Sequence, residues 1–196
     1  MLNLIEYYNR LDSITRCNCL PRIKVNTVKA HTAGVAFACL IIADYEERQG
    51  ASVNLEDLLT GAVVHDMEEV FTGDVPYPFK NIKGVRKKLK EAISDKMEGL
   101  LSNYLSLYLK WENAKSNDIE GRILAYADML DLMIYCKQEI ELGNNYMFPV
   151  IEEAMNVSST LNLSFDTSAD MMTFKDNIDQ LKINRMKTHD FERGIK

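Results

Sequence analysis

Three apolar stretches of helical character constrain this chain most, because each holds ionisable side chains among residues that belong in a core. The stretches cover residues 28–48, 54–72 and 118–142. One buried polar side chain is common, but burying several ionisable groups is expensive unless they pair or bind a metal. Mixed imidazole and carboxylate ligands suit transition-type ions better than calcium or magnesium. The pattern predicts three helices that meet around one metal ion. The expected ligands are His31, His65, Asp66 and Asp128.

The rest of the chain also has helical spacing, and no segment shows the alternation of a strand. Further helices are expected over 3–15, 82–113 (one helix or a pair), 146–160 and 170–185. A length of 196 residues suits one core. We therefore expect an all-α chain with one domain over residues 1–196, a metal-site core over 10–145 and C-terminal helices over 146–185. The loop at 162–169 and a frayed tail from Lys187 complete the prediction.

The net charge and the apolar content of the chain disfavour some classes of binding partner. Lys and Arg number 23 against 29 Asp and Glu, for a net charge of −6, which disfavours duplex nucleic acid because phosphate neutralisation dominates such binding. The longest apolar runs, such as 35–43, are too short to cross a bilayer, and the N-terminus lacks the pattern of a signal peptide. Cys39 and Cys136 lie in apolar helical runs and should be buried thiols. We expect no membrane association and a reducing, cytoplasmic location.

The second stretch ends in an unusual combination of residues. Glu69 follows His65 by four positions and Asp66 by three, so on one helix it shares the ligand face and could act as a general base. Glu68 is expected to be a solvated carboxylate. Gly73 ends the helix, and two prolines should make the next residues a stiff, extended segment.

Two basic positions fit an anionic substrate. Arg16 lies in a cationic loop over 16–27, and its guanidinium suits bidentate contact with phosphate oxygens. Lys80 closes the proline segment. The run of basic residues over 83–90 is expected to be a solvated helix face.

These segments, taken in order, resemble the HD-domain phosphohydrolases, which bind metal through a histidine, a His-Asp doublet and a distant aspartate. The chain looks most like the small 5′-deoxynucleotidase branch of that superfamily. The matching segments are Arg16, the H-D-M-E-E run at 65–69, the G-D-V-P-Y-P-F-K run at 73–80, and the A-D pair at 127–128. The resemblance covers residues 10–145.

The resemblance implies an HD-domain helical bundle with a divalent ion, namely Mn, Co, Fe, Ni or Zn. It implies catalysis by Glu69, leaving-group assistance by Asp74, and phosphate contact by Arg16 and by Lys80. The implied reaction removes the 5′-phosphate of 2′-deoxynucleoside 5′-monophosphates. The branch also implies a homodimer or higher homo-oligomer, for which the aromatic-rich stretch at 100–111 could serve.

One departure keeps alternatives open. The branch commonly places an aromatic residue directly after its arginine, where a ribose 2′-hydroxyl would lie, and this chain has Cys17 there. Cys17 is therefore a candidate substrate-binding residue with weaker discrimination against ribonucleotides. Phage-type relatives remove tripolyphosphate from deoxynucleoside triphosphates such as dATP, which is the enzyme alternative. The non-enzyme alternative is a nucleotide-sensing module without turnover.

Overall fold

The computed structural model describes the backbone of residues 2–80 and 82–192, and side chains as far as residue 185. Within these ranges the chain is helical, and its only β-type pairing is an isolated bridge between Thr15 and Thr27. The all-α prediction is confirmed. The α-helices are α1 (Leu2–Arg10), α2 (Val28–Arg48), α3 (Leu55–Val64), α4 (Glu69–Thr72), α5 (Tyr77–Lys80), α6 (Val85–Leu101), α7 (Leu105–Glu112), α8 (Ile119–Glu141), α9 (Phe148–Ser159) and α10 (Ala169–Glu192). Short 3₁₀ turns are η1 (Leu11–Ser13), η2 (Asn145–Met147) and η3 (Ser164–Thr167).

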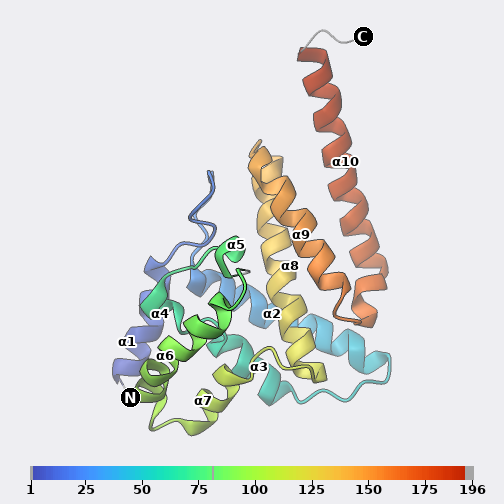
Figure 1. Cartoon of the computed structure of the whole chain (residues 1–196). Helices are drawn as coiled ribbons and strands as arrows, with labels where there is room; N and C mark the ends of the chain where they lie inside the picture. The colour runs from blue at the N-terminus through green and yellow to red at the C-terminus, as the bar shows by residue number, and fades with distance from the viewer. Residues whose placement is uncertain (1, 81, 193–196) are drawn as a thin grey trace.

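The main core lies where α2, α3, α8 and α9 pack together. α8 and α9 run side by side in opposite directions, and α10 extends beyond their upper ends (Figure 1). Ile42 of α2, Leu58 of α3 and Leu124 of α8 are at most 1% exposed, and burying each such side chain contributes about 1.5–3 kcal/mol. This shared core fixes the three helices of the predicted ligands relative to one another.

The caps of these helices follow the sequence. Thr27 accepts a hydrogen bond from the amide of Ala30, at 3.2 Å, and so begins α2. Asn54 and Asp118 cap α3 and α8 in the same way. Gly50 has φ +97°, which few other residues adopt, and follows the end of α2.

A second apolar cluster forms where α6 and α7 pack beside the end of α3. The predicted stretch at 82–113 is a helix pair, broken between Leu101 and Leu105. Met97 and Leu101 are fully buried, and Trp111 is 7% exposed. The basic residues of this stretch are exposed, as expected; Lys83 precedes α6, and Arg86, Lys87, Lys88 and Lys90 lie on it.

The prediction of one helix over 54–72 was wrong. α3 ends at Val64, and His65 Nδ1 donates to the carbonyl of Ala62 at 2.7 Å. A continued α-helix would give that carbonyl to the amide of Asp66. Instead, successive amides bond three residues back, as from Glu69 to Asp66 at 3.1 Å. The imidazole therefore competes with the backbone and tightens this turn to 3₁₀-type geometry.

Three other boundaries also differ. The proline segment contains a single helical turn, α5, because Pro78 sits in the first turn, where no amide hydrogen is needed. The loop at 162–169 contains η3. α10 continues to Glu192, past the expected fraying point at Lys187, while residues 193–196 lie outside the described part.

α2 is also long and apolar enough to cross a membrane, although no uninterrupted apolar run in the sequence reaches that length. Its best window has a mean hydropathy of 1.2, and 44% of that window is buried inside the protein. The core helix of a soluble protein passes the same test. The absence of membrane association stays a prediction.

Candidate active site

The structure brings the four predicted ligands together. His31 Nε2 lies 3.0 Å from Asp128 Oδ1 and 3.7 Å from Asp66 Oδ2. His65 Nε2 lies 3.1 Å from Asp66 Oδ2. Donor atoms of His31, His65 and Asp128 all lie within 4.8 Å of one another, and all three residues are buried. A group of this size suits one ion with bonds of about 2.0–2.2 Å.

The hydrogen bonds of the two histidines leave their Nε2 atoms free to bind a cation. His65 Nδ1 faces the carbonyl of Ala62, and His31 Nδ1 faces Asp131 Oδ2 at 2.6 Å. Both partners can only accept, so each neutral ring carries its hydrogen on Nδ1. His31 Nε2, His65 Nε2 and Asp128 Oδ1 are buried and make no hydrogen bond. Lone pairs that face one another in a dry site need a cation, so the residues present fit a metal ion.

The charges of the site agree with this fit. Burial alone raises the pKa of Asp66, but His65 and Lys115 together bring it below its usual range. Burial likewise raises the pKa of Asp128, and Lys115 above all brings it well below its usual range. Both carboxylates are therefore ionised at neutral pH. Burial lowers the pKa of His65, but Asp66 and Asp128 together leave it above its ordinary value.

Glu69 lies beside the predicted ligands and is 4% exposed. Its Oε1 lies 3.4 Å from Lys80 Nζ, and its Oε2 makes no hydrogen bond. Burial, followed by the charge of Asp66, raises the pKa of Glu69 to about 9. The 3₁₀ turn places Glu69 and Asp66 on one face, since side chains three apart eclipse there.

Glu68 is not the solvated carboxylate that we expected. It is half-buried, and its Oε2 accepts a hydrogen bond from Trp111 Nε1 at 2.7 Å. Burial raises its pKa. The prediction failed because the partner lies on α7, forty-three positions away.

The loop over residues 14–27 carries Arg16 to the site. Arg16 Nη2 lies 3.7 Å from Asp128 Oδ1, and its Nη1 is buried without a hydrogen bond. Burial lowers the pKa of Arg16, but the combined charges of Asp128, Asp66 and other neighbouring groups leave it above its usual value, so the guanidinium stays charged. A buried cation with one unused donor group suits an anionic ligand.

Cys17 and Asp74 are joined directly. The amide of Cys17 donates to Asp74 Oδ2 at 2.8 Å, and Asn18 Nδ2 donates to the Asp74 carbonyl at 2.9 Å. Cys17 has φ +52°, a left-handed backbone conformation. Burial raises the pKa of its thiol to about 11. The carboxylate of Asp74 therefore ties the turn after α4 to the loop that carries Arg16.

A buried carboxylate on α8, Glu139, anchors the same loop and was missed in the sequence. Glu139 is 0% exposed. It accepts hydrogen bonds from the amides of Ile23 at 2.8 Å and Lys24 at 2.6 Å, and from Asn144 Nδ2 at 2.6 Å. Glu139 lies on the same apolar helix as Asp128, and this position could have indicated in the sequence that its carboxylate is buried.

Two further residues of the site were missed. Lys115, in the loop between α7 and α8, forms an ion pair with Asp128 Oδ2. Burial lowers the pKa of Lys115, but Asp128 and Asp66 together leave it above its ordinary value. Nothing in the sequence separates this lysine from solvated ones. Asp131 contacts His31, and its spacing of three from Asp128 on α8 was a usable signal.

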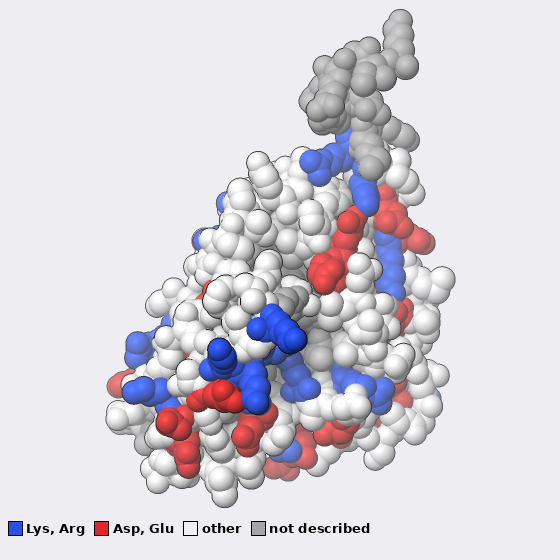
Figure 2. Space-filling view, viewed as in Figure 1, with Lys and Arg blue, Asp and Glu red and all other residues white. Residues whose placement is uncertain are grey.

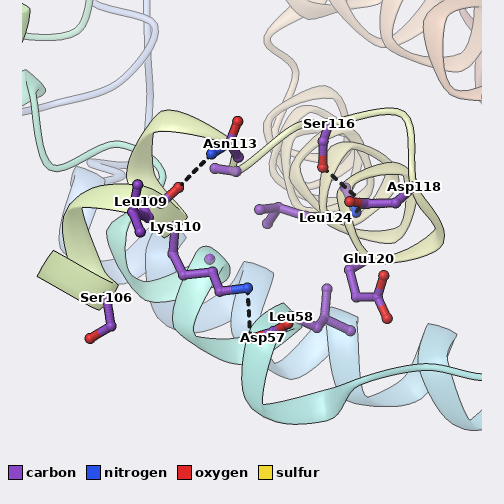
Figure 3. A pocket seen from close by; sticks show the side chains of 13 residues that line it. Asp57, Leu58, Ser106, Leu109, Lys110, Asn113, Ser116, Asp118, Glu120 and Leu124 are labelled. Atoms are coloured by element: carbon purple, nitrogen blue, oxygen red, sulfur yellow. Dashed lines mark hydrogen bonds and ion pairs between the residues drawn. The ribbon is translucent and has the colours of Figure 1, made fainter.

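The basic side chains on the surface and the cavity described below do not identify the same site. Lys and Arg side chains gather near the centre of one face (Figure 2). A cavity of about 320 Å³ opens elsewhere, between α3, α7 and the start of α8, and Lys110 Nζ bridges to Asp57 there at 2.6 Å (Figure 3). None of the predicted site residues lines it. The donor set, rather than this cavity, identifies the candidate site.

Comparison with known proteins places the chain in a family. A family model described as 5′-deoxynucleotidase YfbR-like matches residues 3–177. A 5′-deoxynucleotidase of Photorhabdus laumondii is 28% identical over 152 residues, covering 74% of this chain and 77% of that protein. A 5′-deoxynucleotidase of Yersinia pestis is 22% identical over 196 residues, covering 95% of this chain and 100% of that protein.

Solved structures share the fold. An HD-domain phosphohydrolase from Listeria innocua has a TM-score of 0.80 at 21% identity, with 98% of each chain covered. An HD phosphohydrolase of cyanophage S-2L, bound to dA and one catalytic Zn²⁺, has a TM-score of 0.60 at 16% identity, covering 89% of this chain and 96% of that one. With the family model spanning most of its length, this chain belongs to the 5′-deoxynucleotidase YfbR-like family and is a hydrolase with the HD-domain phosphohydrolase fold.

Proposed function

We propose that the chain removes the 5′-phosphate of 2′-deoxynucleoside 5′-monophosphates, with a divalent transition-type ion held by His31, His65, Asp66 and Asp128. The observation that carries the proposal is the buried, mutually facing donor set next to the unused Nη1 of Arg16. The names of the curated relatives give the same reaction class. The dA and Zn²⁺ in the cyanophage structure support a deoxynucleoside and a zinc-like ion.

The proposed chemistry assigns a role to each residue. When bound, the ion would lower the pKa of a water molecule and polarise a phosphoryl oxygen. Glu69 would accept the proton of the attacking water through its unused Oε2. The pKa of Glu69 is about 9 in the chain alone, and a nearby cation lowers a carboxylate pKa. With the ion bound, Glu69 would therefore be ionised, as a general base must be.

Arg16, Lys80 and Asp74 would handle the substrate and the leaving group. The guanidinium of Arg16 would contact phosphate oxygens through Nη1, and Lys80 would add a second cation from α5. Asp74 holds the amide of Cys17 with one oxygen. Its other oxygen would protonate or orient the sugar O5′ as the P–O bond breaks.

A triphosphohydrolase is the second candidate, and one observation favours it. Three cations surround the carboxylates, since Lys115 joins Arg16 and Lys80. That number of positive charges could hold three phosphates of a deoxynucleoside triphosphate. The product separates the two candidates, because the first releases orthophosphate and the second tripolyphosphate.

The test is a product assay on the full chain after removal of metal with a chelator. The chain is reloaded with Mn²⁺, Co²⁺, Fe²⁺, Ni²⁺ or Zn²⁺ and given matched deoxy and ribo monophosphates and triphosphates. Orthophosphate from deoxy monophosphates supports the proposal. Asp66→Ala should abolish metal binding and turnover, while Asp44→Ala, an exposed change on α2, should leave both unchanged. No product with any metal would instead support a sensing module.

We also propose a cytoplasmic location and assembly into a homodimer or higher homo-oligomer. Of the stretch at 100–111, Leu105 and Leu109 are exposed, whereas Leu101 and Trp111 are buried and could not contribute directly. Light scattering on Leu105→Lys and wild type measures the dependence on that face. If the variant keeps the oligomeric mass of the wild type, the interface lies on another face.

A further inference from the structure

The contact between His31 and Asp131 fixes one predicted ligand. His31 Nδ1 lies 2.6 Å from Asp131 Oδ2, and the His31 side chain is 0% exposed against 21% for Asp131. Because a carboxylate oxygen accepts, the ring hydrogen of neutral His31 resides on Nδ1. The unprotonated Nε2 is then directed at Asp128 Oδ1, 3.0 Å away.

Two helix turns that face one another make this contact possible. Gly34 follows His31 by three residues on α2, and Asp131 follows Asp128 by three residues on α8, so each pair shares a helix face. A Cβ atom at Gly34 would lie 2.0 Å from Asp131 Oδ1 and 2.9 Å from its Cγ. The three atoms nearest to such a Cβ all belong to Asp131. The absence of a side chain at position 34 therefore gives the Asp131 carboxylate its place.

We propose that Asp131 is a positioning residue for the metal ligand His31, and that Gly34 is the residue that admits it. The carboxylate selects the Nδ1–H form of the ring and holds its orientation, so that Nε2 is available to the ion. This inference rests on the metal site of the proposed function and deepens it. Outer partners of this kind typically change metal affinity by about 10- to 100-fold when removed.

The first test measures metal affinity without any turnover. The chelator-stripped full chain is titrated with Zn²⁺ against a chelating indicator, for wild type and Asp131→Ala. We expect Asp131→Ala to weaken zinc binding by about 10- to 100-fold. Nitrogen chemical shifts of His31 in the stripped chain should show the Nδ1–H form in wild type and a mixture in the variant. Equal zinc affinity and an unchanged tautomer would overturn the inference.

The second test uses glycines as matched controls. Gly34→Ala should displace Asp131 and weaken zinc binding as Asp131→Ala does. Gly99→Ala, in α6, adds the same methyl group where nothing lies within 4 Å, and should leave zinc affinity unchanged. If Gly34 acts through Asp131, the double variant Gly34→Ala/Asp131→Ala should bind zinc no more weakly than Asp131→Ala alone. Losses that multiply in the double variant would overturn the role of Gly34.

The inference and the proposed function fail in different ways. A wild-type chain that binds zinc but hydrolyses no nucleotide counts against the proposed function and leaves the role of Asp131 intact. If Gly34→Ala does not fold, Asp131→Ala and the His31 tautomer still decide the matter.

Discussion

Replacing the buried Glu139 should loosen the loop that delivers Arg16. Glu139 is 0% exposed and accepts three hydrogen bonds, two on Oε2 and one on Oε1. In Glu139→Gln the amide oxygen can accept from the two donors that face Oε2, the amide of Ile23 and Nδ2 of Asn144. The new NH₂ group then faces the amide of Lys24, which is also a donor. One buried donor without a partner costs about 1–3 kcal/mol.

Glu139→Ala should cost more, because it leaves all three donors without the carboxylate. Each of these neutral donors, if it stays buried without a partner, costs about 1–3 kcal/mol. That is a large share of a total stability of about 5–15 kcal/mol. Burial alone raises the pKa of Glu139, but the three hydrogen bonds and the charge of Lys24 together lower it below its ordinary value. The stabilisation is therefore present above the ordinary glutamate pKa and is lost as pH falls through the lowered value in the folded chain.

Urea unfolding of the chelator-stripped variants measures these costs, and amide hydrogen exchange over residues 16–26 measures the loop. We expect the exchange to accelerate and the KM for nucleotide to rise. Glu141→Gln is the matched control, since Glu141 lies on the same helix, is exposed, and pairs only with Lys137 among the contacts described for it. It should stay within about 0.5 kcal/mol of wild type. A Glu139→Gln variant that matches this control in both measurements would refute the anchoring argument.

The other predictions concern the site itself. Glu69→Gln should retain metal, measured by metal analysis, and lower kcat by roughly 10² or more; Glu68→Gln should have a mild effect on kcat, and the opposite order would mean that the base is misassigned. Arg16→Ala should raise the KM for every nucleotide irrespective of its base, because it removes a phosphate contact; a loss confined to one base would refute that role. Cys17→Trp should raise the ratio of deoxy to ribo hydrolysis rates, and a wild type that already refuses ribonucleotides would show that another side chain guards the 2′ position. Lys115→Gln should strengthen zinc binding and weaken nucleotide binding, since it leaves Asp128 more negative; unchanged zinc affinity would contradict the ion pair.

Much of the fold could be predicted because it depends on local signals. Side-chain caps and apolar periodicity located α2 and α8, since both act within a few residues of the chain. The break after Val64 could not be predicted in this way. It depends on the His65 ring taking the carbonyl of Ala62, and the choice of that partner is visible only in three dimensions.

The site residues also differ in whether local sequence signals could predict them. The convergence of the four candidate ligands was predictable because four ionisable groups in apolar helices need a common partner. The contacts of Lys115 with Asp128 and of Trp111 with Glu68 could not be predicted. In each contact the two residues come from different elements, and no sequence motif links them. Asp131 was accessible in principle from its spacing on α8, but only the missing side chain of Gly34 shows why a carboxylate fits there.

The charges around the ligands also set an order of binding. Asp66 and Asp128 are ionised, and two cations, Arg16 and Lys115, pair with Asp128, so these two negative and two positive charges balance in the chain alone. Glu69, with its pKa of about 9, adds no negative charge at neutral pH. A divalent ion would make this balanced site positive, which both lowers the pKa of Glu69 and attracts a phosphate dianion. Without the ion, a nucleotide would meet two ionised carboxylates, with Lys115 engaged by Asp128 and only the Nη1 group of Arg16 unused. Nucleotide affinity should therefore depend on prior metal binding, and isothermal titration of stripped and zinc-loaded chain with a deoxynucleoside monophosphate measures that dependence directly.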